Sequence, residues 1–241
     1  AQTLTNLHSF DYTDGSGAYG HPRGALVQGS DGNFYGTTYQ GGTNGLGAVF
    51  KITPAGDYTI LHSFGFIPDG FMPAAGLLRG SDGSFYGTTV GGGLTASGTV
   101  FRITPGGSYA TLYSFGSLPD GRYPWAGLVQ GTDGNFYGTT TGGGTSDGGT
   151  VFKISPGGSY VSLYSFGPDP DGNKPNASLV QGSDGNFYGT TFQGGVSSNG
   201  TVFKINPAGS YATLYSFGLS PDGSNSLAGL VQGSDGNFYG T

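Results

Sequence analysis

Acidic side chains are the first candidates for chemistry, because the chain carries fourteen aspartates and no glutamate. Ten of these aspartates recur at two repeated positions. One set is Asp31, Asp82, Asp133, Asp184 and Asp235, and the other is Asp14, Asp69, Asp120, Asp171 and Asp222. Aspartate in a glycine-containing turn accepts backbone hydrogen bonds, so both positions predict turns. The alternative is a ring of acidic loops that binds Ca²⁺, with one site in each repeat.

One segment resembles the start of a calcium-binding loop. It reads Asp169-Pro170-Asp171-Gly172-Asn173. An EF-hand loop also needs a bidentate glutamate at its twelfth position, where this chain has Val180. Asp169, Asp171 and Asn173 are therefore retained as a candidate Ca²⁺ site, and no other cofactor is predicted.

The three histidines give little material for a zinc or catalytic centre. His8 and His62 stand at a repeated position, and His21 stands alone in a connection. In the other repeats the same position is filled by Tyr113, Tyr164 and Tyr215. A position that accepts either ring indicates packing rather than metal ligation. Without cysteine, glutamate or paired histidines, a zinc site lacks its usual ligands.

Two groups of side chains could bind a ligand without reacting with it. The first closes one strand of each repeat and consists of Gln28, Arg79, Gln130, Gln181 and Gln232. If those strands line a central channel, the amides could hydrogen-bond a small polar molecule; alternatively, they pair with one another or with water. The second group is Trp125, the single tryptophan, with the nearby Tyr123. Exposed aromatic rings of this kind stack on sugars, so this connection is the candidate carbohydrate site.

We expect no enzymatic activity. Nucleophilic catalysis needs a nucleophile, a base and an orienting group in one cleft. Serine, threonine and aspartate recur in every repeat, and no polar cluster is confined to one of them. The repeat symmetry breaks only at the insertion within residues 11–24 and around Trp125.

A repeat of 51 residues must position all of these side chains. Phe-Tyr-Gly-Thr begins at Phe34, Phe85, Phe136, Phe187 and Phe238, and Val-Phe-Lys/Arg-Ile begins at Val49, Val100, Val151 and Val202. The third copy predicts strands at 128–130, 136–140, 150–154 and 160–166, separated by Gly-rich loops and Asp-Gly or Pro-Gly-Gly turns. Four short antiparallel strands followed by a longer crossover are typical of a propeller blade.

The predicted fold class is therefore all-β, a β-propeller of about five four-stranded antiparallel blades with the last one incomplete. A single repeat domain spans residues 1–241. It is divided into a lone fourth strand in 1–10, four-stranded repeats at 25–64, 76–115, 127–166 and 178–217, and a partial repeat at 229–241. In a ring, the N-terminal strand would complete the last blade; alternatively, a neighbouring molecule supplies the missing strand.

Composition limits the classes of partner. Glycine is frequent, at 52 residues, but aromatic residues make up 14%, which favours a packed core over disorder. The net charge is −6 without any basic cluster, so nucleic acid is not an expected partner. No apolar run approaches the ~20 residues of a membrane span. The absence of cysteine excludes disulfides, and the Ala1-Gln2 start suits a chain exported by signal-peptide cleavage.

The segment Gly-Leu-Val-Gln-Gly-Ser-Asp-Gly-Asn-Phe-Tyr-Gly-Thr at 229–241, followed in other copies by Gly-Thr-Val-Phe-Lys-Ile, resembles the Gloeobacter–Verrucomicrobia (GloVer) tandem repeat. More loosely, the pattern is similar to the blades of NHL propellers. The resemblance implies a bacterial exported protein with propeller-like repeats, located outside the cell or at its surface. It implies no reaction and supplies no catalytic residue.

The expected function is a non-catalytic extracellular scaffold for adhesion or for recognition of a carbohydrate or another ligand, such as a glycan or surface polymer. The alternative is a structural subunit that self-associates into a surface filament or layer by exchanging strands between neighbours, since unpaired strand edges favour strand addition.

Overall fold

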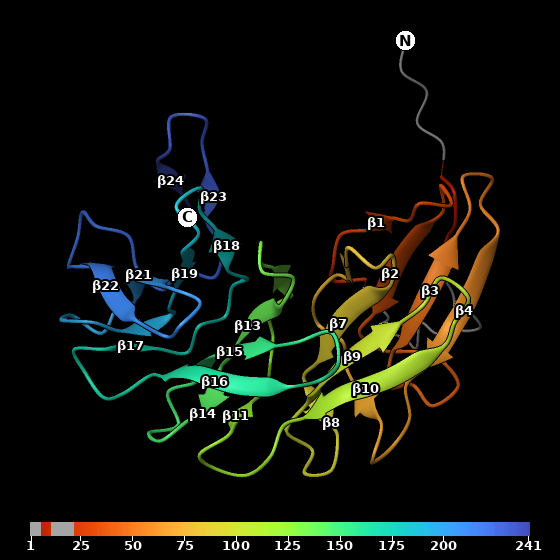
Figure 1. The fold of residues 1–241 in the computed structure, drawn as a ribbon, viewed down its shortest axis with the longest axis horizontal. Helices are drawn as coiled ribbons and strands as arrows, with labels where there is room; N and C mark the ends of the chain where they lie inside the picture. The colour runs from red at the N-terminus through yellow and green to blue at the C-terminus, as the bar shows by residue number, and fades with distance from the viewer. Residues whose placement is uncertain (1–5, 11–21) are drawn as a thin grey trace.

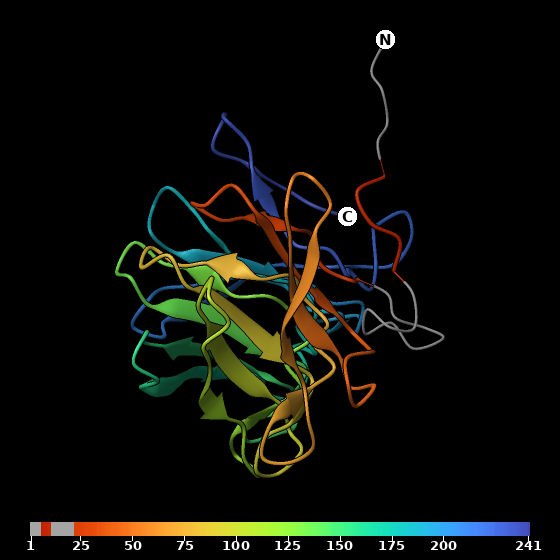
Figure 2. The same cartoon turned by 90° about the vertical axis from the view of Figure 1, so that its right-hand side faces the viewer.

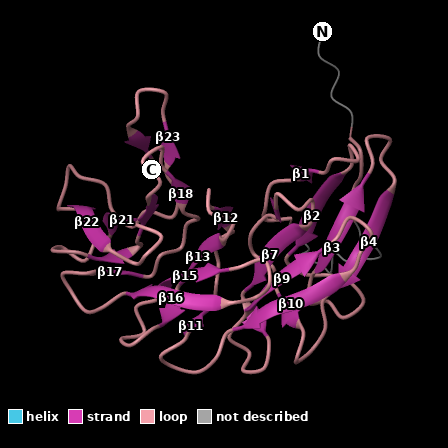
Figure 3. Cartoon of the chain, in the orientation of Figure 1, coloured by secondary structure: helices cyan, strands magenta, loops and turns pink. Residues whose placement is uncertain are grey.

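The computed structural model describes residues 6–10 and 22–241. The described residues form β-strands and turns without a helix (Figure 3), and so contain no helix that could cross a membrane. Four antiparallel sheets stand side by side along an arc, from the N-terminal sheet at the right to the blue C-terminal one at the left (Figure 1). Figure 2 shows the same arc from its right-hand side. This arrangement agrees with the predicted propeller, and the sheets are called blades one to four below.

Each blade pairs its four strands in chain order, with the first strand inside the arc and the fourth outside. The blades are β1 (Val27–Gln28), β2 (Phe34–Thr38), β3 (Ala48–Ile52) and β4 (Tyr58–Ser63); β6 (Leu78–Arg79), β7 (Phe85–Thr89), β9 (Thr99–Ile103) and β10 (Tyr109–Ser114); β12 (Val129–Gln130), β13 (Phe136–Thr140), β15 (Thr150–Ile154) and β16 (Tyr160–Ser165); and β18 (Val180–Gln181), β19 (Phe187–Thr190), β21 (Thr201–Ile205) and β22 (Tyr211–Ser216). The hairpin β23 (Val231–Gln232) and β24 (Phe238–Tyr239) begins a fifth repeat.

Three small sheets, which the sequence did not predict, tie each crossover to the loop of the next blade. They pair β5 (Gly70–Phe71) with β8 (Gly91–Gly92), β11 (Gly121–Arg122) with β14 (Gly142–Gly143), and β17 (Gly172–Asn173) with β20 (Gln193–Gly194). Glycine-containing pairs are poor strand formers, and here backbone pairing holds them together with hydrogen bonds from the hydroxyls of Thr89, Thr140 and Thr191. These sheets fix the path of the chain from one blade to the next.

The core lies between blades rather than within them. The first junction packs Tyr35, Val49 and Phe64 of blade one against Leu77, Phe85, Phe101 and Ile103 of blade two. Equivalent residues build the next two junctions. Blades two and three are therefore covered on both faces, which explains why their two middle strands carry apolar residues at successive positions.

Each residue of the Phe-Tyr-Gly-Thr motif in the second strand makes a different packing contact or hydrogen bond. In blade two, Phe85 stacks on Tyr35 of the preceding blade at 4.1 Å, and Tyr86 packs in a tilted arrangement against Phe136 of the following blade at 4.0 Å. Gly87 leaves room for the ring of Phe101, which any β-carbon there would overlap. The Thr88 hydroxyl donates to the backbone oxygen of Ala126 at 3.0 Å. The motif thus packs its own blade against both the preceding and the following blade.

Residues 6–10 form no strand, although their side chains occupy the place of a fourth strand beside blade one. His8 stacks on Tyr58 at 4.5 Å, as His62 stacks on Tyr109 at 3.7 Å. Phe10 meets Phe50 edge-on at 5.3 Å. Residues 1–5 of the predicted lone strand, together with Asp14 and His21, lie outside the described residues.

Candidate binding face

The arc has two faces that differ in how they use the repeat. One face, called the hairpin face, carries the turns between first and second strands and between third and fourth strands. The other, called the crossover face, carries the loops at 39–47, 90–98, 141–149 and 192–200 and the connections that lead from each fourth strand to the next blade. Because the strands are antiparallel, the loops between second and third strands and the connections to the next blade lie at the same end of the strands.

Aspartates of the hairpin face stabilise turns. The Asp31 carboxylate accepts hydrogen bonds from the Tyr35 hydroxyl at 2.7 Å and from the backbone and side-chain amides of Asn33 at 3.2 and 2.7 Å. The Tyr35 hydrogen bond lowers the pKa of Asp31. Burial, followed by the same carboxylate, raises the pKa of Tyr35 to about 12. In blade two, Ser84 replaces the asparagine, and the Arg102 guanidinium lies 3.2 Å from Asp82.

The predicted glutamine row also lies on the hairpin face, where it connects neighbouring blades. The Gln130 side-chain oxygen accepts from the Ser81 backbone N–H at 3.0 Å, and its amide donates to the Ser81 hydroxyl and the Gly134 oxygen, each at 3.1 Å. Gln181 and Gln232 make the same bridges to Thr132 and Ser183. These partners are the turn of the preceding repeat, not the other glutamines that the sequence analysis considered.

The two remaining members of the row differ from these three. Gln28 donates to the Gly32 oxygen at 3.1 Å, and Arg79 is exposed. Ligand binding by the row stays a prediction.

The second set of aspartates closes the crossovers. Asp120 accepts the Tyr113 hydroxyl at 2.8 Å and the N–H groups of Gly116 and Gly121 at 2.7 Å each. In blade one the ring nitrogen of His62 takes the place of the tyrosine hydroxyl, 3.0 Å from Asp69. The interpretation of His62 as a packing residue is confirmed, since its ring stacks on Tyr109 and supports this turn.

The residues proposed for Ca²⁺ have separate partners. Asp171 accepts from Tyr164, Gly167 and Gly172 at 2.7 to 2.8 Å. Asp169 accepts from the Ser198 hydroxyl at 3.1 Å, and the Asn173 side-chain oxygen is buried without a hydrogen-bond partner. In the described part of the chain, no three histidine or aspartate side chains gather as a metal-binding group. Calcium binding at Asp169, Asp171 and Asn173 stays a prediction.

Variation between repeats is concentrated on the crossover face. One position just before the first strand holds Arg23, Ala74, Trp125, Asn176 and Leu227, and the position after the second strand holds Tyr39, Val90, Thr141 and Phe192. A third position, held by Met72, Tyr123, Lys174 and Asn225, has left-handed backbone, with φ from 54° to 59°. Such conformations are costly for residues other than glycine, so the fold maintains them while allowing the side chain to vary.

Trp125 contacts a residue that the sequence analysis missed. Its ring lies nearly parallel to that of Tyr39, at 19° and with centroids 6.3 Å apart, although the two belong to different repeats. Trp125 is 36% exposed and Tyr123, two residues earlier, is 40% exposed. Beside them Arg122 pairs with Asp147 at 2.5 Å, which raises the pKa of Arg122. Superposing the repeats on their 51-residue step identifies Arg23 as the equivalent of Trp125, but it gives no signal for Tyr39.

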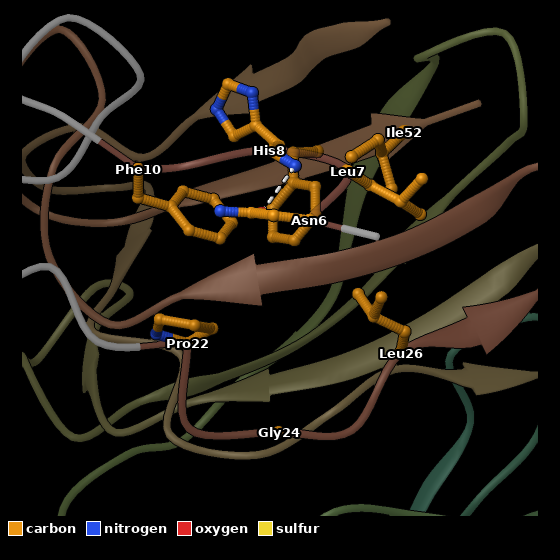
Figure 4. Close-up of a pocket in the computed structure, with 9 residues that line it drawn as sticks. Asn6, Leu7, His8, Phe10, Pro22, Gly24, Leu26 and Ile52 are labelled. Atoms are coloured by element: carbon orange, nitrogen blue, oxygen red, sulfur yellow. Dashed lines mark hydrogen bonds between the residues drawn. The ribbon is translucent and has the colours of Figure 1, made fainter. Parts of the chain in front are cut away.

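A cavity of about 620 Å³ opens beside blade one. Leu7, Phe10, Leu26, Phe50 and Ile52 give it an apolar lining. Figure 4 shows the His8 ring turned away from Pro22 and Leu26. Among the described residues, the lining contains no carboxylate. Its apolar residues match those that fill the junctions between blades.

Solved structures with a similar fold include enzymes and an extracellular domain. Streptogramin B lyase is 18% identical with a TM-score of 0.60, over 91% of this chain and 61% of the lyase. A Xanthomonas campestris gluconolactonase is 14% identical with a TM-score of 0.54, over 90% of this chain and 67% of that one. The extracellular domain of a B. thetaiotaomicron protein assigned to a hybrid two-component system is 12% identical with a TM-score of 0.61, over 91% of this chain and 26% of that one.

At these identities the likeness shows a common β-propeller fold. Among curated proteins, none matches this sequence. The sequence model of the Gloeobacter/Verrucomicrobia repeat matches residues 21–241, which include all four blades and the hairpin of the fifth repeat. The chain therefore belongs to the Gloeobacter/Verrucomicrobia repeat family.

Proposed function

We propose that this chain is a non-catalytic extracellular scaffold that recognises carbohydrate through its crossover face. The observation that carries the proposal is the parallel, partly exposed pair of Trp125 and Tyr39 at a position where the repeats differ. Flat aromatic rings bind the apolar face of a pyranose, while neighbouring polar groups orient it. Tyr123, two residues before Trp125 in the same crossover, is also exposed.

The division of labour between the two faces supports a binding role. Hairpin-face side chains repeat in type and bond to one another, as Asp133 does with Tyr137 and Asn135. Crossover-face side chains vary on a backbone that stays the same. A constant frame with variable loops at one end is the usual arrangement of binding proteins.

The comparisons support the extracellular part of the proposal only through fold. One structural neighbour is an extracellular domain, whereas two others are a lyase and a gluconolactonase. Function resides in sites that folds carry, and the polar groups described above form turns and bridges rather than a nucleophile with its base.

Removing the tryptophan tests the proposal. Trp125→Ala places at this position the residue that Ala74 supplies in blade two, so the fold should be retained. A glycan array first identifies the glycans that the parent protein binds. We expect the variant to bind them at least about fivefold more weakly, since a stacked ring contributes roughly 1 kcal/mol beyond its buried area. Leu219→Ala, at an exposed crossover side chain, is the control. Unchanged glycan binding by the Trp125 variant would overturn the proposal.

A further inference from the structure

A cation, Arg23, lies over the Tyr39 ring of the aromatic pair. The Arg23 guanidinium carbon lies 4.0 Å from the centre of the Tyr39 ring, so Arg23, Tyr39 and Trp125 form a row of three planar groups. Arg23 is exposed, Tyr39 is half-buried and Trp125 is partly exposed. A guanidinium over a ring face is held by the cation–π attraction while its N–H groups remain able to donate in the ring plane.

The repeat explains how this row forms. Arg23 and Trp125 hold the same position in blades one and three, and Ala74 holds it in blade two between them. Ala74 carries only a methyl group, and the indole of Trp125 lies against the ring of Tyr39 in blade one. The row therefore brings together the connections before blades one and three and the loop at 39–47 of blade one.

Charge distinguishes Arg23 from the other arginine nearby. Arg122 is paired with Asp147, whose carboxylate also accepts the Gly143 N–H at 2.7 Å. Within residues 6–10 and 22–241, no carboxylate lies at ion-pair distance from Arg23. The guanidinium thus presents donors that fit an anionic group of a ligand, for which arginine offers two parallel hydrogen bonds.

We infer that the Arg23–Tyr39–Trp125 row binds an anionic polysaccharide, with a pyranose ring on the indole of Trp125 and a carboxylate on Arg23. This inference rests on the proposed carbohydrate function and adds the charge class of the ligand. Uronic acid chains carry the required carboxylates, and sulfated glycans carry an anion of similar reach, so the test includes both.

The sole tryptophan makes the site its own reporter, because any change in indole emission arises at Trp125. The 241-residue protein is titrated with polygalacturonate, its fully methyl-esterified form, dextran sulfate and neutral dextran. We expect polygalacturonate to shift the emission and to bind at least about tenfold more tightly than the esterified polymer. Raising the salt concentration should weaken this binding.

Two variants that each remove a cation separate a local contact from general charge. Arg23→Gln should reduce polygalacturonate affinity about tenfold and leave any binding of the neutral polymers unchanged. Lys204→Gln removes a cation from β21 in blade four, outside every proposed binding group, so it should leave all affinities unchanged.

The outcomes distinguish this inference from the proposed function. Polygalacturonate binding that depends on Arg23 supports both. Preference for dextran sulfate over polygalacturonate would reject the carboxylate and keep the anionic class. Equal binding of charged and neutral polymers, unaffected by Arg23→Gln, would overturn the inference and leave carbohydrate recognition standing. If none of the polymers changes the emission, the inference falls, whereas the proposed function falls only if Trp125→Ala also leaves array binding intact.

Discussion

Asp133 illustrates how single residues are used in this protein. Its carboxylate accepts the Tyr137 hydroxyl at 2.8 Å and both amides of Asn135. The Tyr137 ring is fully buried, and its other face meets the next blade through Phe187 at 3.9 Å. A residue that looks like a metal ligand in the sequence thus links a turn to the junction between blades. The hydrogen-bonding capacity of this carboxylate therefore stabilises the fold.

Removing one hydroxyl tests this role. Tyr137→Phe should lower the free energy of unfolding by about 1–2 kcal/mol, because the buried ring stays in place while a hydrogen bond to a charged group is lost. Urea denaturation measures the change. Tyr239→Phe removes the same bond, to Asp235 at 2.6 Å, from a side chain that is 54% exposed. The loss there should be smaller; equal losses would contradict the argument from burial.

At the level of elements, the sequence predicts the second and third strands of each blade but not the contacts that join residues of different repeats. The expected strands at 136–140 and 150–154 agree with β13 and β15, because turn residues bracket each apolar run. The paired glycines of β8 and β14 escaped prediction, since their strand conformation comes from a crossover distant in sequence. For the same reason the sequence offered Trp125 and Tyr123 but not Tyr39, which a different blade contributes.

The second strand tolerates no side chain at its glycine. A β-carbon on Gly138 would lie 2.6 Å from the Phe152 ring and 3.0 Å from Leu128. Gly138→Ala should therefore destabilise the protein by about 1–3 kcal/mol, the usual cost of overpacking a core. Thermal or urea unfolding provides the measurement.

Gly157→Ala is the matched control, since its nearest neighbour would be 3.8 Å away and the equivalent residues Ala55 and Ala208 already carry this methyl group. Its stability should change by less than about 0.5 kcal/mol. If the two variants were equally stable, the packing assigned to the Phe-Tyr-Gly-Thr motif would be wrong.

For the whole molecule, repeated hydrogen bonds from tyrosines and amides to aspartates confer a pH dependence. The fold lowers the pKa of Asp31 and Asp184 chiefly through hydrogen bonds from Tyr35 and Asn186, relative to an ordinary value of 3.8. Stability from such groups is complete above pH 3.8 and is lost as the pH falls through the lower pKa of the folded state. Burial raises the pKa of Tyr35 and Tyr86 from 10.0 to about 12. Their contribution is complete below pH 10 and is lost as the pH rises toward 12.

We therefore expect a broad plateau of stability from about pH 4 to pH 10, with losses on both sides. Urea unfolding midpoints measured from pH 2 to pH 12 test this. Tyr137→Phe should reduce the loss of stability above pH 10, since one buried hydroxyl no longer titrates. A midpoint that stays constant below pH 4 would show that the aspartate hydrogen bonds do not stabilise the fold.

The bridges between hairpin turns have a consequence for how such a chain can change over generations. Gln130, Gln181 and Gln232 each reach back 49 residues, and Thr88, Thr139 and Thr190 each reach forward 38, so every one of these bonds ends in an adjacent repeat. Because each repeat makes the same bonds to its neighbours, deleting or duplicating a 51-residue segment would preserve the bonds between the repeats that become adjacent. Recombination between repeats would then reshuffle the order of side chains around Trp125 while leaving the buried junctions intact, and new binding specificities could arise without a single point mutation.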